Sequence, residues 1–214
     1  IYISGQAYPE LHSYLKSAGH KVVTVPENSY LETAINSHPD LVMCKMGSLP
    51  NSPVIFSNSA PRGGYPDNAA FCAVATGKYL IHRLDITSHL ILSKAKEMGF
   101  KLIDVRQGYA KCSCVAVDDN SIITADRGIA TVLSKYDDIH VLLITPGYVE
   151  LPGYKYGFMG GASGRVYDEI IFNGSLESHP DGEAIRKFII SRKLKVRDFP
   201  GLPLRGIGSI IQAA

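Results

Sequence analysis

Residues 112–147, CSCVAVDDNSIITADRGIATVLSKYDDIHVLLITPG, decide the fold. Their first two segments, 112–119 and 120–126, are rich in apolar and β-branched residues and meet at a turn-prone Asp-Asn dipeptide, which predicts a strand pair. A helix is expected over 127–137 and a further apolar strand over 140–147. The stretch therefore predicts a strand–strand–helix–strand unit.

The same pattern recurs on both sides of this stretch. Residues 156–200 repeat it in full, with a helix expected over 181–194 and Asp181 as its cap. Residues 1–26 and 78–107 each read as a strand, a helix that ends at a glycine, and a second strand. Copies that follow one another at about 40 residues are typical of a repeat architecture.

One unit differs from the others because it lacks a helix. Segments 38–47 and 53–61 read as strands, but the Pro/Gly-rich residues 60–68 follow without a helical stretch. GIGSIIQAA, at the end of the chain, is a lone strand that must complete another unit. The sequence thus predicts a single domain over 1–214, a ring in which strand 206–212 closes onto the N-terminal unit.

The composition is that of a globular protein, with 45% hydrophobic and 20% charged residues. A net charge of +2 without a Lys/Arg run indicates neither a nucleic-acid nor a membrane partner. No apolar stretch approaches the roughly 20 residues of a membrane span, and a signal-peptide layout is missing, so a cytoplasmic protein is expected. The four cysteines are expected to be reduced thiols.

The strings HPDLVMC, YPDNAAF, QGYAKCSCVAVDDNSIITADRGI, YGFMGGASGRV and GIGSII resemble an uncharacterised bacterial family assigned to the pentein fold. This is the fold of the guanidino-group-modifying enzymes: arginine deiminases, dimethylarginine hydrolases and amidinotransferases. The resemblance implies an α/β (α+β) fold, a pentein-like five-bladed α/β propeller built from strand–strand–helix–strand units, with one unit shortened.

The resemblance also implies a mechanism, from which this chain departs. In the catalytic penteins a cysteine on the first strand of the last unit attacks the guanidino carbon, a histidine is the general acid/base, and two carboxylates hold the guanidinium. Here that cysteine position falls nearest Ser209. A serine hydroxyl needs a dedicated base, whereas a thiolate is already a strong nucleophile. The departure favours another nucleophile or a non-catalytic role.

Lys111-Cys112-Ser113-Cys114 offers such a nucleophile. On the expected strand, Cys112 and Cys114 share one face, and Lys111 would lower a thiol pKa. Alternatively, both are small buried apolar residues. No metal site and no cofactor are expected, because a Cys-x-Cys pair needs further ligands and the other cysteines and histidines lack ligand spacing.

Two histidines are candidates for the general acid/base. His82, expected on the first strand of its unit, could pair with Cys112, and His179 directly follows the glycine-rich hairpin. A structural, hydrogen-bonded His82 is the alternative. The string Ser-His-Pro-Asp occurs at 37–40 and again at 178–181, and both copies read as turns in which the aspartate caps the next element.

The glycine-rich stretch YGFMGGASGR, residues 156–165, matches no nucleotide-binding fingerprint and precedes an expected strand, so it is no phosphate cradle. Its glycines either let strands approach closely or turn their backbone toward a ligand. The residues expected to bind a substrate are Asn68, Lys111, Asp126, Gly160, Gly161, Ser163 and Ser209. Asn68 and Asp126 read equally well as helix caps, Asn68 for a helix over 69–75.

The function expected from these observations is binding of a small molecule, guanidino-like or amino-acid-like, in a central polar pocket. Hydrolase or transferase chemistry at an amidine- or guanidine-like C–N centre would then proceed through a cysteine thiol. The alternative is a non-catalytic ligand sensor or protein-interaction scaffold, since a fold does not fix a function.

Overall fold

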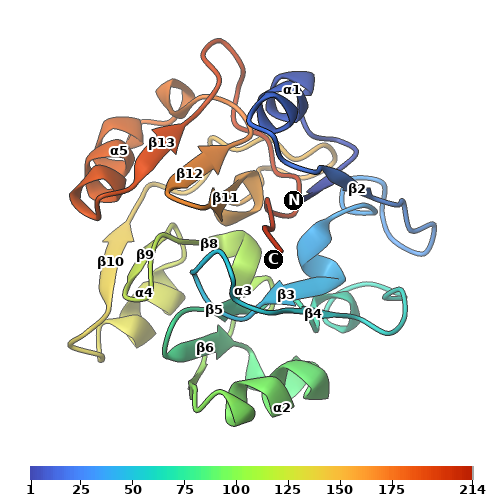
Figure 1. Cartoon of the computed structure of the whole chain (residues 1–214). Coiled ribbons are helices and arrows are strands. Elements are labelled where there is room, and N and C mark those ends of the chain that lie inside the picture. The colour runs from blue at the N-terminus through green and yellow to red at the C-terminus, as the bar shows by residue number, and fades with distance from the viewer. Residues whose placement is uncertain (214) are drawn as a thin grey trace.

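The computed structural model describes residues 1–213 and has a mixed α/β architecture with small sheets and short helices. Over these residues the strands form five sheets, and no strand is shared between two of them. Figure 1 shows the sheets around the middle of the molecule, with α1, α2, α4 and α5 at the outside and α3 near the centre. No helix within 1–213 is long and apolar enough to cross a membrane.

Three sheets have the strand–strand–helix–strand order predicted from the sequence. In each, the first two strands are antiparallel, and a helix leads to a third strand parallel to the second. They comprise β5 (Val74–Ala75), β6 (Tyr79–His82), α2 (His89–Glu97) and β7 (Lys101–Asp104); β8 (Cys114–Ala116), β9 (Ser121–Thr124), α4 (Arg127–Leu133) and β10 (His140–Leu143); and β11 (Ser163–Val166), β12 (Glu169–Phe172), α5 (Gly182–Ser191) and β13 (Lys195–Arg197).

The N-terminal sheet pairs β1 (Tyr2–Ser4) in parallel with β2 (Val23–Val25) across helix α1 (Pro9–Ser17). Tyr2 also forms an antiparallel bridge with Ile211, so the end of the chain lies beside its beginning (Figure 1). The rest of the predicted strand 206–212 is irregular.

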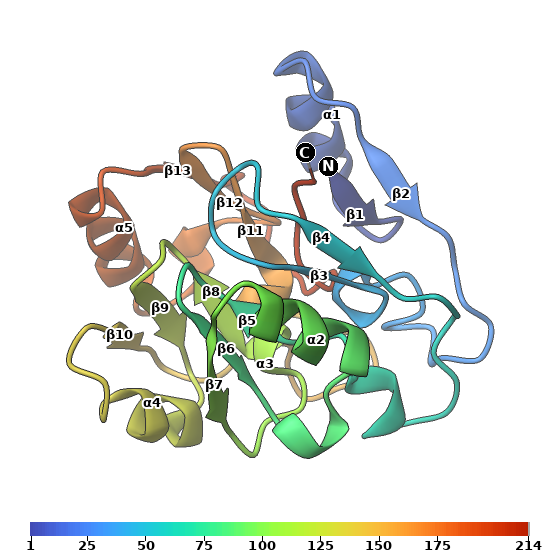
Figure 2. The same cartoon turned by 60° about the horizontal axis from the view of Figure 1, so that its bottom comes forward.

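The remaining sheet pairs β3 (Met43–Lys45) with β4 (Val54–Phe56), and its connection to β5 contains no α-helix within the described residues (Figure 2). The helix expected over 69–75 is wrong. The segment forms only the short turn η2 (Asp67–Ala69) before β5, because its last two residues pair with β6 instead. His82 accordingly ends the second strand of its unit, not the first.

Each of the four longer helices buries one pair of side chains four residues apart, which places both on one face. Each pair packs in a different hydrophobic cluster with its own sheet: Leu11 and Leu15, Ile91 and Ala95, Ile129 and Leu133, Ile185 and Ile189. Full burial of a leucine or isoleucine stabilises the fold by about 1.5–3 kcal/mol. Each of these clusters also contains residues of a neighbouring sheet, so the core continues from one unit to the next.

The expected helix ends are partly confirmed. Gly19 and Gly99 follow α1 and α2 with φ values of 83° and 71°, the left-handed conformation that suits glycine. Asp126 caps α4 by accepting a hydrogen bond from Ile129 N. Asp181 does not cap α5, because its carboxylate accepts from Thr145 N at 2.6 Å instead.

Candidate functional site

The candidate site lies where four short segments meet near the centre of the molecule. These are α3 (Ala110–Ser113), the turns η1 (Pro39–Leu41) and η4 (Gly160–Ala162), and the irregular segment around Ser209. The turns η3 (Leu84–Ile86) and η5 (Leu176–Ser178) lie elsewhere along the chain. Backbone bonds tie the site together: Asp40 N donates to Gly208 O, and Ser209 N donates to Gly161 O.

The two candidate cysteines do not share a strand face. Ser113 N donates to Tyr109 O at 2.9 Å, which closes a helical turn where the sequence predicted a strand. Cys112 therefore faces a pocket together with His38 and Tyr109, whereas Cys114 begins β8 and is buried in a hydrophobic cluster. Burial raises the pKa of the Cys114 thiol to about 12, so it is not a nucleophile at neutral pH.

A chain of hydrogen bonds links the polar groups of the site. The Cys112 thiol donates to Asp40 Oδ2 at 2.9 Å. Ser209 Oγ lies 2.9 Å from the same carboxylate oxygen and 3.0 Å from Gly160 O, and its single proton can serve one of them at a time. Lys111 Nζ donates to Ser209 Oγ at 3.1 Å. Lys111 is thus linked to Asp40 only through a hydroxyl.

Ser209 occupies a strained backbone conformation. Its φ is 74°, in the left-handed region that costs a non-glycine residue about 1–2 kcal/mol. The preceding Gly208 has a φ of 67°, and a Cβ there would lie 2.2 Å from His38 Cβ. Such strain gathers at sites where the surrounding structure fixes a side chain. Here it aims the hydroxyl at Asp40 and Lys111.

Above Cys112 lies a cavity of about 190 Å³, which we call the aromatic pocket. Its walls are largely aromatic and aliphatic, and none of its lining residues within the described chain carries a carboxylate, ammonium or guanidinium group. They are Ile35, His38, Leu41, Tyr109, Cys112, Leu151, Tyr154, Tyr156, Gly157, Phe158, Gly161 and Gly206. Pockets of this kind, apolar with few polar groups, are typical of small-molecule sites.

Burial and neighbouring groups keep the pocket floor uncharged. The Cys72 thiol, burial and the negative charge of Asp40 all raise the pKa of Cys112 well above its usual range. Burial lowers the pKa of His38, although the charge of Asp40 opposes this effect. Cys112 is thus a thiol and His38 a neutral imidazole at pH 7. The charge of Lys111 acts to lower the pKa of Cys114, as expected, but burial outweighs this effect. The pKa of Cys112 is raised, and the Lys111 ammonium group contacts Ser209 instead.

His38, Asp40 and Cys112 also form a candidate ligand set for a metal ion. One donor atom from each lies within 4.8 Å of the others, and all three residues are buried. Within residues 1–213, His38 Nε2 and Asp40 Oδ1 have no hydrogen-bond partner. Imidazole, carboxylate and thiolate together suit zinc. No ligand spacing was visible in the sequence because Asp40 and Cys112 lie 72 residues apart.

Both predicted acid/base histidines are engaged elsewhere. His82 Nδ1 lies 2.7 Å from Thr87 Oγ1, and its Nε2 lies 2.7 Å from Gly108 O, so the ring is fully used in structure. His179 accepts from Asp181 N at 3.0 Å and lies 3.1 Å from Thr145 O. The expected pairing of His82 with Cys112 is therefore not formed.

Among the other predicted binding residues, three have structural contacts. Asn68 accepts from the Tyr109 hydroxyl at 2.7 Å and so orients one wall of the aromatic pocket. Asp126 serves as the cap of α4, and Ser163 donates to Met159 O at 3.0 Å while fully buried.

The two glycines lie in the turn η4, not in the strand expected there. At Gly160 a Cβ would lie 2.3 Å from Cys114 O, so this glycine allows close packing. Gly161 lines the aromatic pocket, where a Cβ would lie 3.5 Å from Cys112 Sγ. Gly160 thus fits the alternative of close packing, and Gly161 fits the alternative of backbone turned toward a ligand.

His38 and Asp40 lie in the turn that the sequence predicts, but Asp40 does not cap the next element. The Asp40 carboxylate faces the centre because Gly208 packs on His38 and bonds to Asp40 N. The repeated Ser-His-Pro-Asp string could have drawn attention to them. The string alone does not show that the copy at 37–40 is wholly buried and the copy at 178–181 is not. The burial of residues 37–40 depends on the distant C-terminal segment.

Comparisons with known proteins give two matches. One solved structure is similar, titled as SxtG, an amidinotransferase from Microseira wollei in the saxitoxin biosynthetic pathway. The identity is 13% and the TM-score 0.37; the match covers 90% of this chain and 56% of that one, so the chain spans little more than half its length. Curated proteins give no significant match. The sequence pattern of DUF6873, a family of unknown function, matches residues 2–211, and the chain belongs to that family.

Proposed function

We propose that the aromatic pocket binds a small planar cation of the amidine or guanidine type and that Cys112 attacks its central carbon. The observation that carries this proposal is the position of the Cys112 thiol, on the pocket floor and 2.9 Å from the buried Asp40 carboxylate. A nucleophile within hydrogen-bond reach of a base, at the end of a pocket, is the arrangement that covalent catalysis requires.

The pocket favours a cation over an anion. Its tyrosine and phenylalanine rings offer faces that attract a guanidinium or amidinium ion. Asp40, behind Cys112, supplies negative charge, and its Oδ1 has no hydrogen-bond partner among residues 1–213. A bound cation would also stabilise the thiolate and so offset the raised pKa of Cys112.

The reaction balances with the groups present. The Cys112 thiol gives its proton to Asp40, and the sulfur forms a bond to the amidinium carbon. The C–N bond to the leaving amine then breaks, and that nitrogen takes the proton from Asp40. Water or an acceptor amine next attacks the carbon and gives a proton to neutral His38. The C–S bond then breaks, and the Cys112 sulfur takes that proton back from His38. Water gives hydrolysis, and an amine gives group transfer.

The fold supports the same proposal. Sheets of strand–strand–helix–strand order surround the centre, and Tyr2 pairs with Ile211. We infer from this a pentein-like propeller formed by one domain over 1–214, with its site at the axis. The nucleophile would then come from α3 and not from the C-terminal segment, where Ser209 stands.

The test compares two small electrophiles of similar size, the cation 2-chloroacetamidine and the neutral chloroacetamide. In each, sulfur displaces chloride, and mass spectrometry identifies the alkylated residue. The quantity compared is the rate of alkylation by chloroacetamidine divided by the rate of alkylation by chloroacetamide. We expect this ratio to be at least about tenfold higher for Cys112 than for free cysteine. Asp40→Asn should remove this preference, whereas Asp181→Asn, a matched change outside the pocket, should keep it. An equal ratio for protein and free cysteine would refute the proposal.

A non-catalytic ligand sensor is the second candidate, favoured by the raised pKa of Cys112. A sensor would bind amidines reversibly, and Cys112→Ser would bind them as well as the wild type does. If chloroacetamidine spares Cys112 while calorimetry with acetamidine shows binding that requires Asp40, the sensor replaces the enzyme. Zinc that binds in a manner dependent on Cys112 would exclude both, because it would occupy the sulfur and neutralise the Asp40 carboxylate on which cation binding depends.

A further inference from the structure

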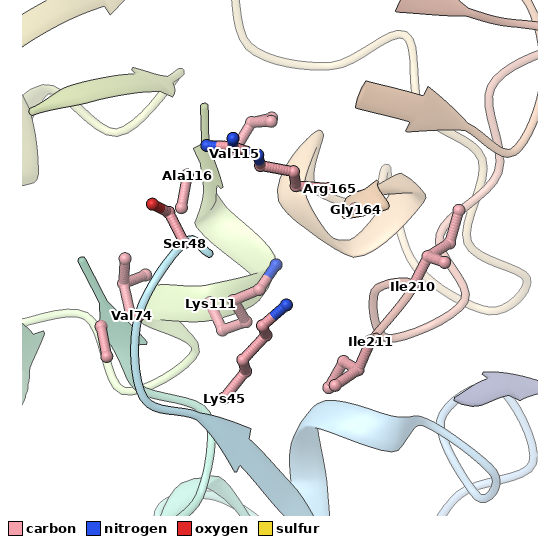
Figure 3. Close-up of a pocket in the computed structure, with 12 residues that line it drawn as sticks. Lys45, Ser48, Val74, Lys111, Val115, Ala116, Gly164, Arg165, Ile210 and Ile211 are labelled. Atoms are coloured by element: carbon pink, nitrogen blue, oxygen red, sulfur yellow. The ribbon is translucent and has the colours of Figure 1, made fainter. Parts of the chain in front are cut away.

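A second, smaller cavity is lined by Lys111, the residue before Cys112, and shares no lining residue with the aromatic pocket. Its volume is about 40 Å³. Three cationic side chains line it, each from a different part of the chain: Lys45 at the end of β3, Lys111 in α3, and Arg165 in β11. Figure 3 shows the ammonium ends of Lys45 and Lys111 directed toward the same space, with Arg165 across from them. We call this space the cationic cavity.

The positive charges of the cationic cavity are poorly compensated. Its described lining residues include no aspartate or glutamate. Lys45 makes no side-chain hydrogen bond or ion pair to any residue of the described chain 1–213. Lys111 donates to the neutral Ser209 hydroxyl, and Arg165 donates to the carbonyl oxygens of Val117 and Tyr167.

The carboxylates near this cavity act from outside it. Burial lowers the pKa of Arg165, and the charges of Asp118, Asp119 and Asp168 oppose this effect only in part. Burial, together with Arg165 and Lys111, lowers the pKa of Lys45 from 10.5 to about 8. Cations brought together without counter-charge cost free energy, and a bound anion would remove that cost.

We propose that the cationic cavity binds one small anion, either a halide ion or a single carboxylate group. A buried water molecule needs a cavity volume of about 10–15 Å³, so the cationic cavity has room for roughly three groups of the size of a water molecule. Chloride and formate fit this space, whereas a sugar acid does not. Lys45 and Lys111 supply rotatable ammonium donors, and Arg165 adds the charge of its guanidinium. The proposal does not depend on any chemistry at Cys112.

The test measures thermal unfolding by circular dichroism at one ionic strength in sodium gluconate, chloride or formate. Gluconate is the reference because it is too bulky for the cavity. We expect chloride or formate to raise the midpoint of the wild type by about 2–4 °C, because an anion bound only to the folded state stabilises it. A shift with chloride alone identifies a halide site, and a shift with formate identifies a carboxylate site.

The matched variants are Lys45→Met and Lys101→Met, the second at an exposed position on β7. The shift should vanish in Lys45→Met and persist in Lys101→Met. An identical shift in both variants would reveal a general salt effect and overturn the proposal, as would no shift in the wild type. If Lys45→Met does not fold, broadening of the chloride-35 resonance by the wild type and its reversal by formate provide the same test.

Discussion

Asp40 is the residue on which the candidate site depends. One carboxylate oxygen lies 2.9 Å from both the Cys112 sulfur and the Ser209 hydroxyl, while the other has no partner within residues 1–213. A buried carboxylate without a cation is costly, so its position must be imposed by its neighbours. Gly208 imposes it, because Gly208 O accepts from Asp40 N and the glycine packs directly on His38.

We therefore expect Gly208→Ala to destabilise the protein beyond the cost of its φ angle. The left-handed conformation alone costs alanine about 1–2 kcal/mol, and a Cβ at 2.2 Å from His38 Cβ adds a clash. Gly201→Ala is the matched control, because its φ is 82° and no atom lies within 4 Å of the added Cβ. Urea unfolding should show a larger loss for Gly208→Ala. Equal losses would mean that the contact with His38 is not tight.

At the scale of elements, the turn η4 packs against α3 and sets the position of Cys112. Its two glycines differ sharply in what surrounds them. A Cβ at Gly160 would lie 2.3 Å from Cys114 O and 2.4 Å from Lys111 O, both backbone atoms, whereas one at Gly161 would make ordinary contact with Cys112. The first glycine thus holds the elements together, and the second leaves room in the aromatic pocket.

These surroundings predict that substitutions at Gly160 and Gly161 change different properties, the first stability and the second the reactivity of Cys112. Gly160→Ala should lower the free energy of unfolding by about 1–3 kcal/mol, because backbone must move to admit the methyl group. Gly161→Ala should change stability little but slow alkylation of Cys112 by chloroacetamidine, since the methyl group narrows the pocket. Denaturation and alkylation rates measured on both variants check this. If Gly161→Ala alkylates as fast as the wild type, ligands do not reach the sulfur past this turn.

The order of elements was largely predictable from the sequence, whereas the site was not. Apolar periodicity and glycine caps are local signals, and they located the helices α1, α2, α4 and α5. The site joins segments far apart: Asp40 and Ser209 are separated by 169 residues, and Asp40 and Cys112 by 72. Local pattern also failed at α3, where packing of Gly160 against the backbone of Lys111 and Cys114 accompanies a helical turn instead of a strand.

At the scale of the whole molecule, the centre holds a buried carboxylate and three half-buried cations. The Asp40 carboxylate lies beside Cys112. The cationic cavity is lined by Lys45, Lys111 and Arg165. Because the cations come from separate sheets and α3, the fold as a whole bears the cost of their repulsion. The pH dependence of unfolding can measure part of that cost.

We expect Lys45→Met to raise the free energy of unfolding at pH 7, measured in gluconate buffer. The folded-state pKa of Lys45, about 8, lies below its ordinary value of 10.5. Below pH 8 the lysine is charged in both states, and the folded state bears the full cost of that charge. Between pH 8 and 10.5 the folded state loses its proton first, so wild-type stability recovers and the advantage of the variant shrinks.

Urea unfolding of both proteins at pH 7 and pH 10 checks this expectation, with Lys101→Met as the control. Groups far from Lys45 titrate alike in the wild type and the variant, so the difference between the two proteins isolates Lys45 and its interaction with Lys111 and Arg165. If the difference in the free energy of unfolding between wild type and Lys45→Met stays constant from pH 7 to pH 10, the surroundings do not lower the pKa of Lys45.

Lys111 borders the cationic cavity, and through Ser209 and Asp40 it is linked to the thiol beneath the aromatic pocket. If both cavities bind their proposed ligands, this shared chain couples the two equilibria. Thermodynamic reciprocity then applies: the factor by which chloride changes the affinity for an amidine equals the factor by which the amidine changes the affinity for chloride. A cation in the aromatic pocket and an anion in the cationic cavity would thus report on each other's concentration.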